Sequence, residues 1–515
     1  MKRSFMFMLL FAAAHEAPAQ TSSGFAAQRL EVPGSLRWVV YGDVDGDGAV
    51  DLVVSYRRGG GPKAQRFLAV FFRGTDGFSR RPDLAFQAIP VAAAFDLGDV
   101  DGKPGQELLS WTADGVYAQS LKGRRVSQPY RIIEMQTLLG SAEDEDLVHW
   151  NMLRPFGPGG MNVIILPGRG RLHIFKKEGP LWKIWADLKF PNQSFYEPES
   201  ETFRPTDDGG GFGSYSFRAL TIVPKLSLVE QSGDGRIDIV AAFEDQVAVY
   251  VQEAAGGFKD EPDVQRYFQL RTEEELETGE AFVQSQVMDL NGDNIADLSL
   301  RKNTGGIRDA QSTIQLFLGQ RGGGFSETPA QVIERKGVAS LVGFEDVDGD
   351  GTIELLLPRL EISLFSIIGV FTSGKIAIDV DIFPRDLGGS DLFSLKPKQT
   401  LTVRLGIDFD DGGSVQGGAP ILGHDFDGDG RRDIILSDGG DRMLMHRGLE
   451  AGNDNYFQRS GYIELVGPGS PTTLALPTGS PDGLPDVLTY FVSRRKHAGQ
   501  LLLQQNRYEA PSAAP

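Results

Sequence analysis

Residues 425–436 read DFDGDGRRDIIL, an acidic, glycine-containing loop that runs directly into an apolar β-type segment. Counted from Asp425, carboxylates occupy positions 1, 3, 5 and 9 of this frame, and glycines occupy positions 4 and 6. Alternate positions of a tight loop direct their side chains toward one centre, and glycine permits the backbone dihedral angles that such coiling needs. The frame therefore predicts a hairpin whose loop gathers oxygen atoms.

The same frame recurs along the chain. Residues 43–51 and 346–354 repeat it with both glycines, and residues 289–297 repeat it with Asn291 at position 3. Weaker copies begin at Asp99, Glu230 and Thr478, and a copy at Arg154 keeps glycines but has no carboxylate. The eight copies are about 62 residues apart on average, which indicates a repeat architecture.

Short β-type segments surround each copy. A third apolar segment follows the hairpin, as at residues 67–72, and a Gly-Phe turn comes next, as at Gly77-Phe78 and Gly324-Phe325. Four short antiparallel strands per repeat predict an all-β fold, a β-propeller of about eight four-stranded blades with calcium-binding hairpin loops. Residues 24–30 have the pattern of a Gly-Phe turn and one further strand, so we expect them to pair with residues 500–504 and complete an eighth blade. Seven blades remain the alternative.

Calcium is the cation that this loop chemistry favours. It binds six to eight oxygen ligands, and an EF-hand loop would need Glu at position 12. Position 12 here is apolar and lies within a β-type segment, as at Val54 and Leu436. The predicted cofactor is therefore calcium on a hairpin loop, with these ligands: Asp43, Asp45, Asp47 and Asp51; Asp289, Asn291, Asp293 and Asp297; Asp346, Asp348, Asp350 and Glu354; Asp425, Asp427, Asp429 and Asp433. Weaker candidates are Asp234, Asp238, Asp482 and Asp486.

The loop that begins at Asp99 departs from the frame. Lys103 stands at position 5, where the other loops have a carboxylate. We expect its ammonium to take the place of the ion and to form an internal salt bridge.

The repeated unit, with its Gly-Phe turns, resembles the FG-GAP/VCBS repeats, as in the head of integrin α-subunits. The resemblance extends over roughly residues 24–510, and it is most specific at the four full loops. It implies a propeller that carries calcium between the first and second strands of a blade. The copy at Arg154 lies outside the pattern.

The N-terminus predicts a secretory signal peptide at residues 1–19. Lys2 and Arg3 precede an apolar run, and residues 17–19 fit the small-residue cleavage pattern. We therefore expect an exported protein in the periplasm, at the cell surface or secreted, with a disordered tail at residues 511–515. No later stretch has 18 consecutive apolar residues, so no membrane span is expected.

Composition excludes several classes of protein. The chain has 515 residues and no Cys, which excludes disulfides, thiolate metal sites and Cys nucleophiles. The formal charge is -19, which argues against a general nucleic-acid binder. No His lies in H-E-x-x-H and no Ser in G-x-S-x-G, so no catalytic residue is predicted.

Two insertions, residues 192–217 and 385–420, are expected on the face opposite the acidic loops. In an up-and-down blade, the first and third turns lie at one end, and the second turn and the crossing to the next blade lie at the other. Binding residues concentrate on long loops. On the same face, basic residues are candidate contacts for an anionic ligand, namely Arg57, Arg58, Arg494 and Arg495.

These features favour a non-enzymatic binding or scaffolding protein that mediates adhesion or assembly at the cell envelope. The expected partner is a protein or a glycan, and an anionic polysaccharide or a lipid phosphate would suit the basic residues. The alternative is a carbohydrate-active enzyme, such as a polysaccharide lyase on a calcium-bearing propeller. The sequence leaves enzymatic activity open.

Overall fold

The computed structural model describes most of the chain between residues 24 and 508. The described residues are 24–59, 64–139, 146–157, 160–190, 193–198, 217–279, 281–305, 310–339, 342–360, 373–389, 391–408, 414–416, 420–439, 442–466, 472–477, 483–490 and 499–508. The predicted signal peptide and the predicted tail lie outside them.

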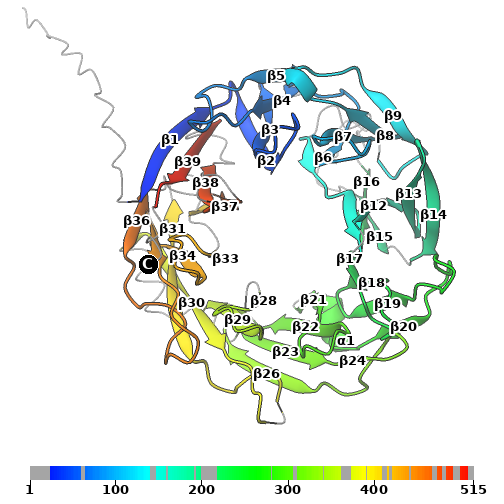
Figure 1. The fold of residues 1–515 in the computed structure, drawn as a ribbon. Coiled ribbons are helices and arrows are strands. Elements are labelled where there is room, and N and C mark those ends of the chain that lie inside the picture. The colour runs from blue at the N-terminus through cyan, green and yellow to red at the C-terminus, as the bar shows by residue number, and fades with distance from the viewer. Residues whose placement is uncertain are drawn as a thin grey trace, which may run out of the picture.

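Eight antiparallel sheets form the blades of a closed ring, as Figure 1 shows. Blade 1 consists of β2 (Ser35–Gly42), β3 (Asp51–Arg58), β4 (Gln65–Phe71) and β5 (Leu84–Gln87). Blade 2 consists of β6 (Ala94–Gly98), β7 (Glu107–Thr112), β8 (Gly115–Gln119) and β9 (Tyr130–Glu134), and β10 (Val148–His149) pairs with β6 in parallel. Blade 3 consists of β11 (Leu153–Phe156), β12 (Met161–Gly168), β13 (Arg171–Glu178) and β14 (Leu181–Lys189). Blade 4 consists of β17 (Lys225–Val229), β18 (Asp238–Phe243), β19 (Gln246–Tyr250) and β20 (Val264–Tyr267).

The second half of the ring repeats this plan. Blade 5 consists of β21 (Phe282–Met288), β22 (Asp297–Thr304), β23 (Gln311–Phe317) and β26 (Gln331–Lys336). Blade 6 consists of β27 (Val338–Ala339) and β28 (Gly343–Glu345), which both pair with β29 (Glu354–Leu360), and of β30 (Lys375–Phe383), β31 (Gln399–Asp408) and β32 (Ser414–Gln416). Blade 7 consists of β33 (Ile421–His424), β34 (Asp433–Ser437), β35 (Arg442–His446) and β36 (Ile463–Val466). Smaller elements are the hairpins β15–β16 (Gln193–Pro198, Phe217–Ile222) and β24–β25 (Gly319–Gln320, Gly324–Phe325), the 3-10 helix η2 (Lys122–Arg124) and the helix α1 (Glu273–Thr278).

The two ends of the described chain close the ring. Blade 8 consists of β37 (Thr472–Leu476), β38 (Asp486–Tyr490), β39 (Gln500–Asn506) and the N-terminal strand β1 (Phe25–Glu31). β1 pairs antiparallel with β39 from Phe25 opposite Asn506 to Glu31 opposite Gln500. This pairing leaves no open sheet edge between the first and last strands. It confirms the predicted eight-bladed propeller, and the alternative of seven blades is wrong.

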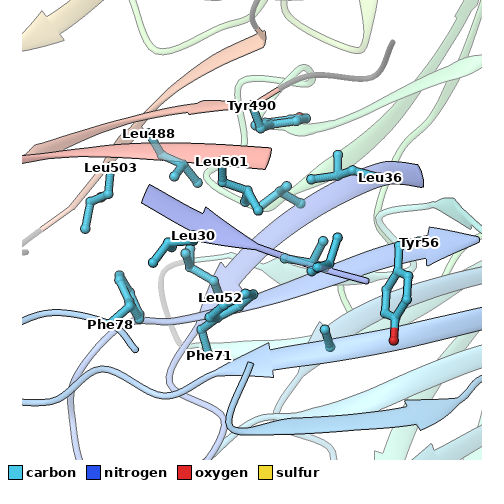
Figure 2. Close-up of a cluster of buried hydrophobic side chains, with 14 of the residues drawn as sticks. Leu30, Leu36, Leu52, Tyr56, Phe71, Phe78, Leu488, Tyr490, Leu501 and Leu503 are labelled. Atoms are coloured by element: carbon cyan, nitrogen blue, oxygen red, sulfur yellow. The ribbon is translucent and has the colours of Figure 1, made fainter. Parts of the chain in front are cut away.

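The hydrophobic core lies between neighbouring blades. In the described residues the buried apolar side chains form eight clusters, and each cluster joins two adjacent blades. Figure 2 shows the cluster that joins blade 8 to blade 1, where Leu488 and Leu501 lie near Leu36 and Leu52. Fully burying a leucine side chain contributes roughly 1.5–3 kcal/mol. Because the side chains of each cluster come from two blades, their burial is complete only when both blades are present.

The Phe in the turn between the third and fourth strands holds adjacent blades together. In the Gly77-Phe78 turn of blade 1, the N–H of the buried Phe78 donates to the side-chain oxygen of Gln28 in blade 8 at 3.3 Å, and the Gln28 amide nitrogen donates to the Phe78 carbonyl. Blades 6 and 7 keep the Phe without the preceding Gly. Phe457, between β35 and β36, is buried. The side chain of Gln399, on the outer strand of blade 6, makes hydrogen bonds to both the carbonyl and the N–H of Phe457. The Gln399 amide nitrogen donates to the Phe457 carbonyl at 2.9 Å, and its oxygen accepts from the Phe457 N–H at 2.9 Å. Gln331 of blade 5 holds Phe393 of blade 6 by the same two bonds. The Phe therefore recurs because it fills the junction with the preceding blade.

The stretch 385–420 was predicted to be an insertion on the face opposite the acidic loops, and this prediction is wrong. Residues 399–408 form β31, which pairs with β30 along the blade. The segment before β31 is a turn between the third and fourth strands, so it lies at the end that carries the acidic loops. The Arg385 guanidinium, for example, donates to the carbonyl of Asn291 in the acidic loop of blade 5 at 3.2 Å.

The stretch 192–217 follows blade 3 and precedes blade 4. Its two flanks pair as β15 and β16, with Gln193 opposite Ile222. β15 and β16 lie between the outer strand β14 and the next inner strand β17 in the chain, so chain alternation puts this hairpin at the end opposite the acidic loops. Residues 199–216 lie outside the described part of the chain.

Candidate metal loops

The four full loops, in blades 1, 5, 6 and 7, share the same hydrogen bonds from backbone N–H groups to the carboxylate at position 1. In blade 1 the two carboxylate oxygens of Asp43 accept from the N–H groups of Gly46 at 2.7 Å and Gly48 at 3.0 Å. Both glycines have positive φ, 85° and 88°, which L side chains rarely adopt. In blade 5 the sixth residue is Asn294 with φ 63°, and asparagine is the ordinary substitute for glycine in this conformation. Position 1 therefore organises the loop from within.

The carboxylate at position 9 joins the loop to the blade. Asp433 is fully buried at the start of β34, and its two oxygens accept from the N–H groups of Phe426 at 3.0 Å and Gly448 at 2.9 Å. Asp51 and Asp297 make the corresponding pairs of bonds in blades 1 and 5. Each carboxylate oxygen has two lone pairs, so these bonds leave acceptor capacity for a cation.

The predicted carboxylates converge in blades 1, 6 and 7. One oxygen from each of Asp346, Asp348 and Glu354 lies within 4.8 Å of the others, and the blade 1 and blade 7 loops form equivalent groups: Asp43, Asp45 and Asp51; Asp425, Asp427 and Asp433. In blade 5, position 3 is the amide of Asn291, which donates to Asp293 at 2.9 Å. Hard oxygen donors at this spacing suit calcium.

Burial destabilises the charged form of the position 9 carboxylates. It raises the pKa of Asp51 and of Asp297 to about 6, and the pKa of Glu354 and of Asp433 to about 7, and repulsion from neighbouring loop carboxylates acts in the same direction. Burial also raises the pKa of Asp45 and Asp348. A bound divalent cation would reverse this trend, because it stabilises the charged carboxylates.

The blade 2 loop contains its own cation. Asp99, Asp101 and Glu107 converge like the full loops, but the Lys103 ammonium lies 2.8 Å from Asp101, and Lys122 lies 4.0 Å from it. The hydrogen bond from Lys103 lowers the pKa of Asp101. The predicted internal salt bridge is therefore present.

The blade 7 loop fits calcium poorly, which the sequence did not predict. Asp427 is 1% exposed, and one of its oxygens accepts from the Arg447 guanidinium at 2.6 Å and from the Tyr462 hydroxyl at 3.0 Å. Arg431 forms an ion pair with Asp429. Arg447 lies beyond the repeated frame, at the end of β35, so the frame itself gave no signal for it.

Blades 1 and 6 have weaker protein cations beside their loops. Arg124 is 3.6 Å from the Asp45 carboxylate, and Arg432 is 3.9 Å from the Asp346 carboxylate, both longer than a hydrogen bond. The Arg432 guanidinium donates instead to the backbone carbonyl of Asp346. Among the described residues, no ion pair reaches the blade 5 carboxylates Asp289 and Asp293. The loops of blades 1 and 6 combine converging carboxylates with weak protein cations and fit a metal ion best. The blade 5 loop has the same backbone hydrogen bonds, but its carboxylates do not form such a group among the described residues.

The weaker candidates that the structure describes already have partners within the protein. Asp234 in blade 4 pairs with Arg236, and both oxygens of Asp238 accept backbone N–H groups, from Ser232 at 2.7 Å and Gln252 at 2.8 Å. In blade 8 the buried Asp486 pairs with Arg73 of blade 1. Asp482 lies outside the described residues.

Two of the basic residues predicted to contact a ligand, Arg57 and Arg58, are engaged within the protein. Arg57 pairs with Asp146 at 3.0 Å, and Arg37 pairs with the same carboxylate at 2.8 Å. Arg58 lies over the Phe67 ring and donates to the Pro33 carbonyl at 3.3 Å. Arg494 and Arg495 lie outside the described residues, so their contact with an anionic ligand stays a prediction.

Comparison with known proteins shows distant likeness only. No family model and no curated protein matches the chain. Among solved structures, the Dos1 propeller aligns over 94% of this chain and 96% of its own length, with 9% identity and a TM-score of 0.42. BBS1N, solved in complex with ARL6DN, aligns over 83% and 96%, with 11% identity and a TM-score of 0.36. The β-propeller domain of Cps50 (Swd1) from Myceliophteria thermophila aligns over 81% and 97%, with 11% identity and a TM-score of 0.35.

At these identities and TM-scores the likeness carries no argument about function. The assignment of eight blades rests on the strand pairing itself. In the part of the chain that the structure describes, no helix has the length and apolar character needed to cross a bilayer.

Proposed function

We propose that the chain is an exported, calcium-stabilised propeller of the FG-GAP/VCBS type, which binds or scaffolds a protein or glycan at the cell envelope. The observation that carries the proposal is the convergence of carboxylates in loops that have no tightly bound protein cation. Blade 6 is the best example, because three acidic side chains meet there and burial raises the pKa of Glu354 to about 7. The propeller fold itself suits a binding or scaffolding role.

Calcium would stabilise rather than catalyse in this proposal. Blades 1, 5 and 6 are the proposed sites, and the ion would be held by the carboxylates at positions 1, 3, 5 and 9, with Asn291 at position 3 in blade 5. Its charge would offset the repulsion among these groups. Because each loop also contacts the next blade, ion binding would strengthen the ring: the Asp43 carbonyl, for example, accepts from the Gln106 N–H at 2.7 Å.

The test is a calcium titration of the purified protein after treatment with a chelator. Calorimetry and elemental analysis should give about three ions per chain, with dissociation constants of roughly 10⁻⁴–10⁻³ M, as is typical of extracellular calcium modules. Fewer than two ions per chain would overturn the proposed calcium sites. Export is tested separately, by locating the protein with and without residues 1–19.

A further inference from the structure

A cavity of about 720 Å³ lies between blades 6 and 7. One wall is the outer strand β31, and the other is formed by β34, β35 and the segment before β36. We call it the 6–7 groove and define it by Lys398, Arg404, Leu436, Leu444, His446 and Arg459. Its volume is that of sites for small organic ligands, which occupy roughly 300–1,000 Å³.

The lining of the groove is positively charged. Lys398, Arg404 and Arg459 contribute three cations, and Asp438 is the only carboxylate among the described lining residues. Asp438 already pairs with Arg404 at 3.4 Å and with Arg442 at 3.3 Å. No described carboxylate lies within ion-pair distance of Lys398 or Arg459, and the Lys398 ammonium lies 4.1 Å from the centre of the Tyr456 ring. Two cations that line one cavity in a protein of charge -19 favour an anionic ligand.

The floor of the groove offers apolar and hydrogen-bonding surface. Leu436 is buried and Leu444 half-buried, and both line the cavity. His446 is 7% exposed, and its Nδ1 lies 2.9 Å from the carbonyl of Gln458. A carbonyl only accepts, so Nδ1 carries the hydrogen, and in the neutral ring Nε2 is an acceptor that a ligand hydroxyl can satisfy.

We propose that the 6–7 groove binds a carboxylate-bearing saccharide of about disaccharide size. Lys398 and Arg459 contact the carboxylate, the two leucines contact the apolar face of the sugar ring, and His446 accepts from a hydroxyl. A bare anion would use the cations but leave most of the cavity unfilled. This inference deepens the proposed binding function, because it names a ligand class and a site, and it does not require calcium to be the loop cation.

The experiment uses the full chain with calcium present. A hexuronate disaccharide is titrated by calorimetry, beside a neutral disaccharide of equal size and inorganic phosphate. Binding should be seen for the hexuronate, and the neutral sugar and phosphate should bind at least about tenfold more weakly. Arg459→Gln and Lys398→Gln should each weaken hexuronate binding about tenfold. Lys259→Gln is the matched control, because Lys259 is an exposed cation in the corresponding segment of blade 4 and pairs with Asp263.

The outcomes separate this inference from the proposed calcium sites. Arg459→Gln should keep the wild-type calcium stoichiometry. No hexuronate binding by wild type, equal binding of the neutral sugar or of phosphate, or unchanged binding by both groove variants would overturn the groove assignment, whatever the calcium result. Loss of calcium binding alone would overturn only the proposed sites in blades 1, 5 and 6.

Discussion

The acidic loops of blades 2 and 6 share one frame but differ in what neutralises them. In blade 6 the residue at position 5 is Asp350, and burial raises the pKa of Glu354 at position 9 to about 7. In blade 2 the residue at position 5 is Lys103, which pairs with Asp101 and lowers its pKa. Between these two loops, position 5 therefore decides whether the loop contains its own cation or has an excess of negative charge. In blade 7 position 5 is Asp429, and the cation that pairs with Asp427 is Arg447, from outside the frame.

Chelation should have the largest effect, because it removes every external cation at once. At a free calcium concentration of ten times Kd, each site adds about 1.4 kcal/mol, so three sites add about 4 kcal/mol to the free energy of unfolding. Scanning calorimetry before and after addition of a chelator measures this difference. An unchanged melting temperature would contradict the proposed role of the blade 1, 5 and 6 loops.

Arg447→Gln should remove the protein cation that pairs with Asp427 in the blade 7 loop. The loop would then have an excess of negative charge, like the blade 6 loop. Without calcium, the variant leaves the buried Asp427 without its ion pair and should lose about 3 kcal/mol of stability. With calcium, the chain should bind one more ion and regain most of this loss. Arg442→Gln is the control, since Arg442 is an exposed arginine of the same blade. If Arg447→Gln binds the same number of calcium ions per chain as wild type, then a feature other than Arg447 prevents calcium binding in the blade 7 loop.

A reciprocal exchange at position 5 tests the comparison directly. Lys103→Asp should add one calcium ion in blade 2, and Asp350→Lys should remove one ion in blade 6. Elemental analysis of the two variants and of the double variant measures the count, which should return to the wild-type value in the double variant. If neither single variant changes the count, position 5 is not the deciding residue.

The smallest expected effect concerns the backbone of blade 5. Asn294 occupies position 6 with φ 63°, where blades 1, 6 and 7 have glycine. Asn294→Ala should lower the free energy of unfolding by about 1 kcal/mol, because alanine tolerates this conformation poorly, and Asn294→Gly should change it by less than about 0.5 kcal/mol. Denaturant titrations of both variants provide the measurement. Equal stability of the two would contradict the backbone argument.

The fold could be predicted because the signals that specify it are local and repeat. The acidic frame marks the turn between the first and second strands, and the Gly-Phe turn marks the junction with the preceding blade, as Phe78 and Gln28 show. Closure through residues 24–30 followed from counting strands. The position of the stretch 385–420 was wrong because it contains β31, whose alternation of polar and apolar residues from Thr400 to Leu405 is typical of a strand. Length alone suggested one long insertion, whereas the stretch is a turn followed by the outer strand of blade 6.

The candidate sites were predictable only as far as their residues are close in sequence. Spacing alone indicated that Asp346, Asp348 and Glu354 would converge. The pairing of Asp427 with Arg447 joins residues of different turns, and the pairing of Arg57 with Asp146 joins neighbouring blades, so no local pattern predicts them. The 6–7 groove also combines residues from two blades, and only the structure shows that its cations share one cavity.

The pairing of β1 with β39 also has a consequence for the order of folding. The eighth blade joins strands that nearly the whole chain separates, so forming it closes a very long loop, at an entropic cost that grows with the logarithm of loop length. Contacts of such high sequence separation form late. The backbone amides of blades 1 to 7 can therefore be protected from hydrogen exchange first. β1 and the cluster around Leu30 and Leu501 become ordered only after β39 has formed. Pulsed hydrogen exchange during refolding should show the β1 amides among the last to be protected, and early protection of β1 would refute this order.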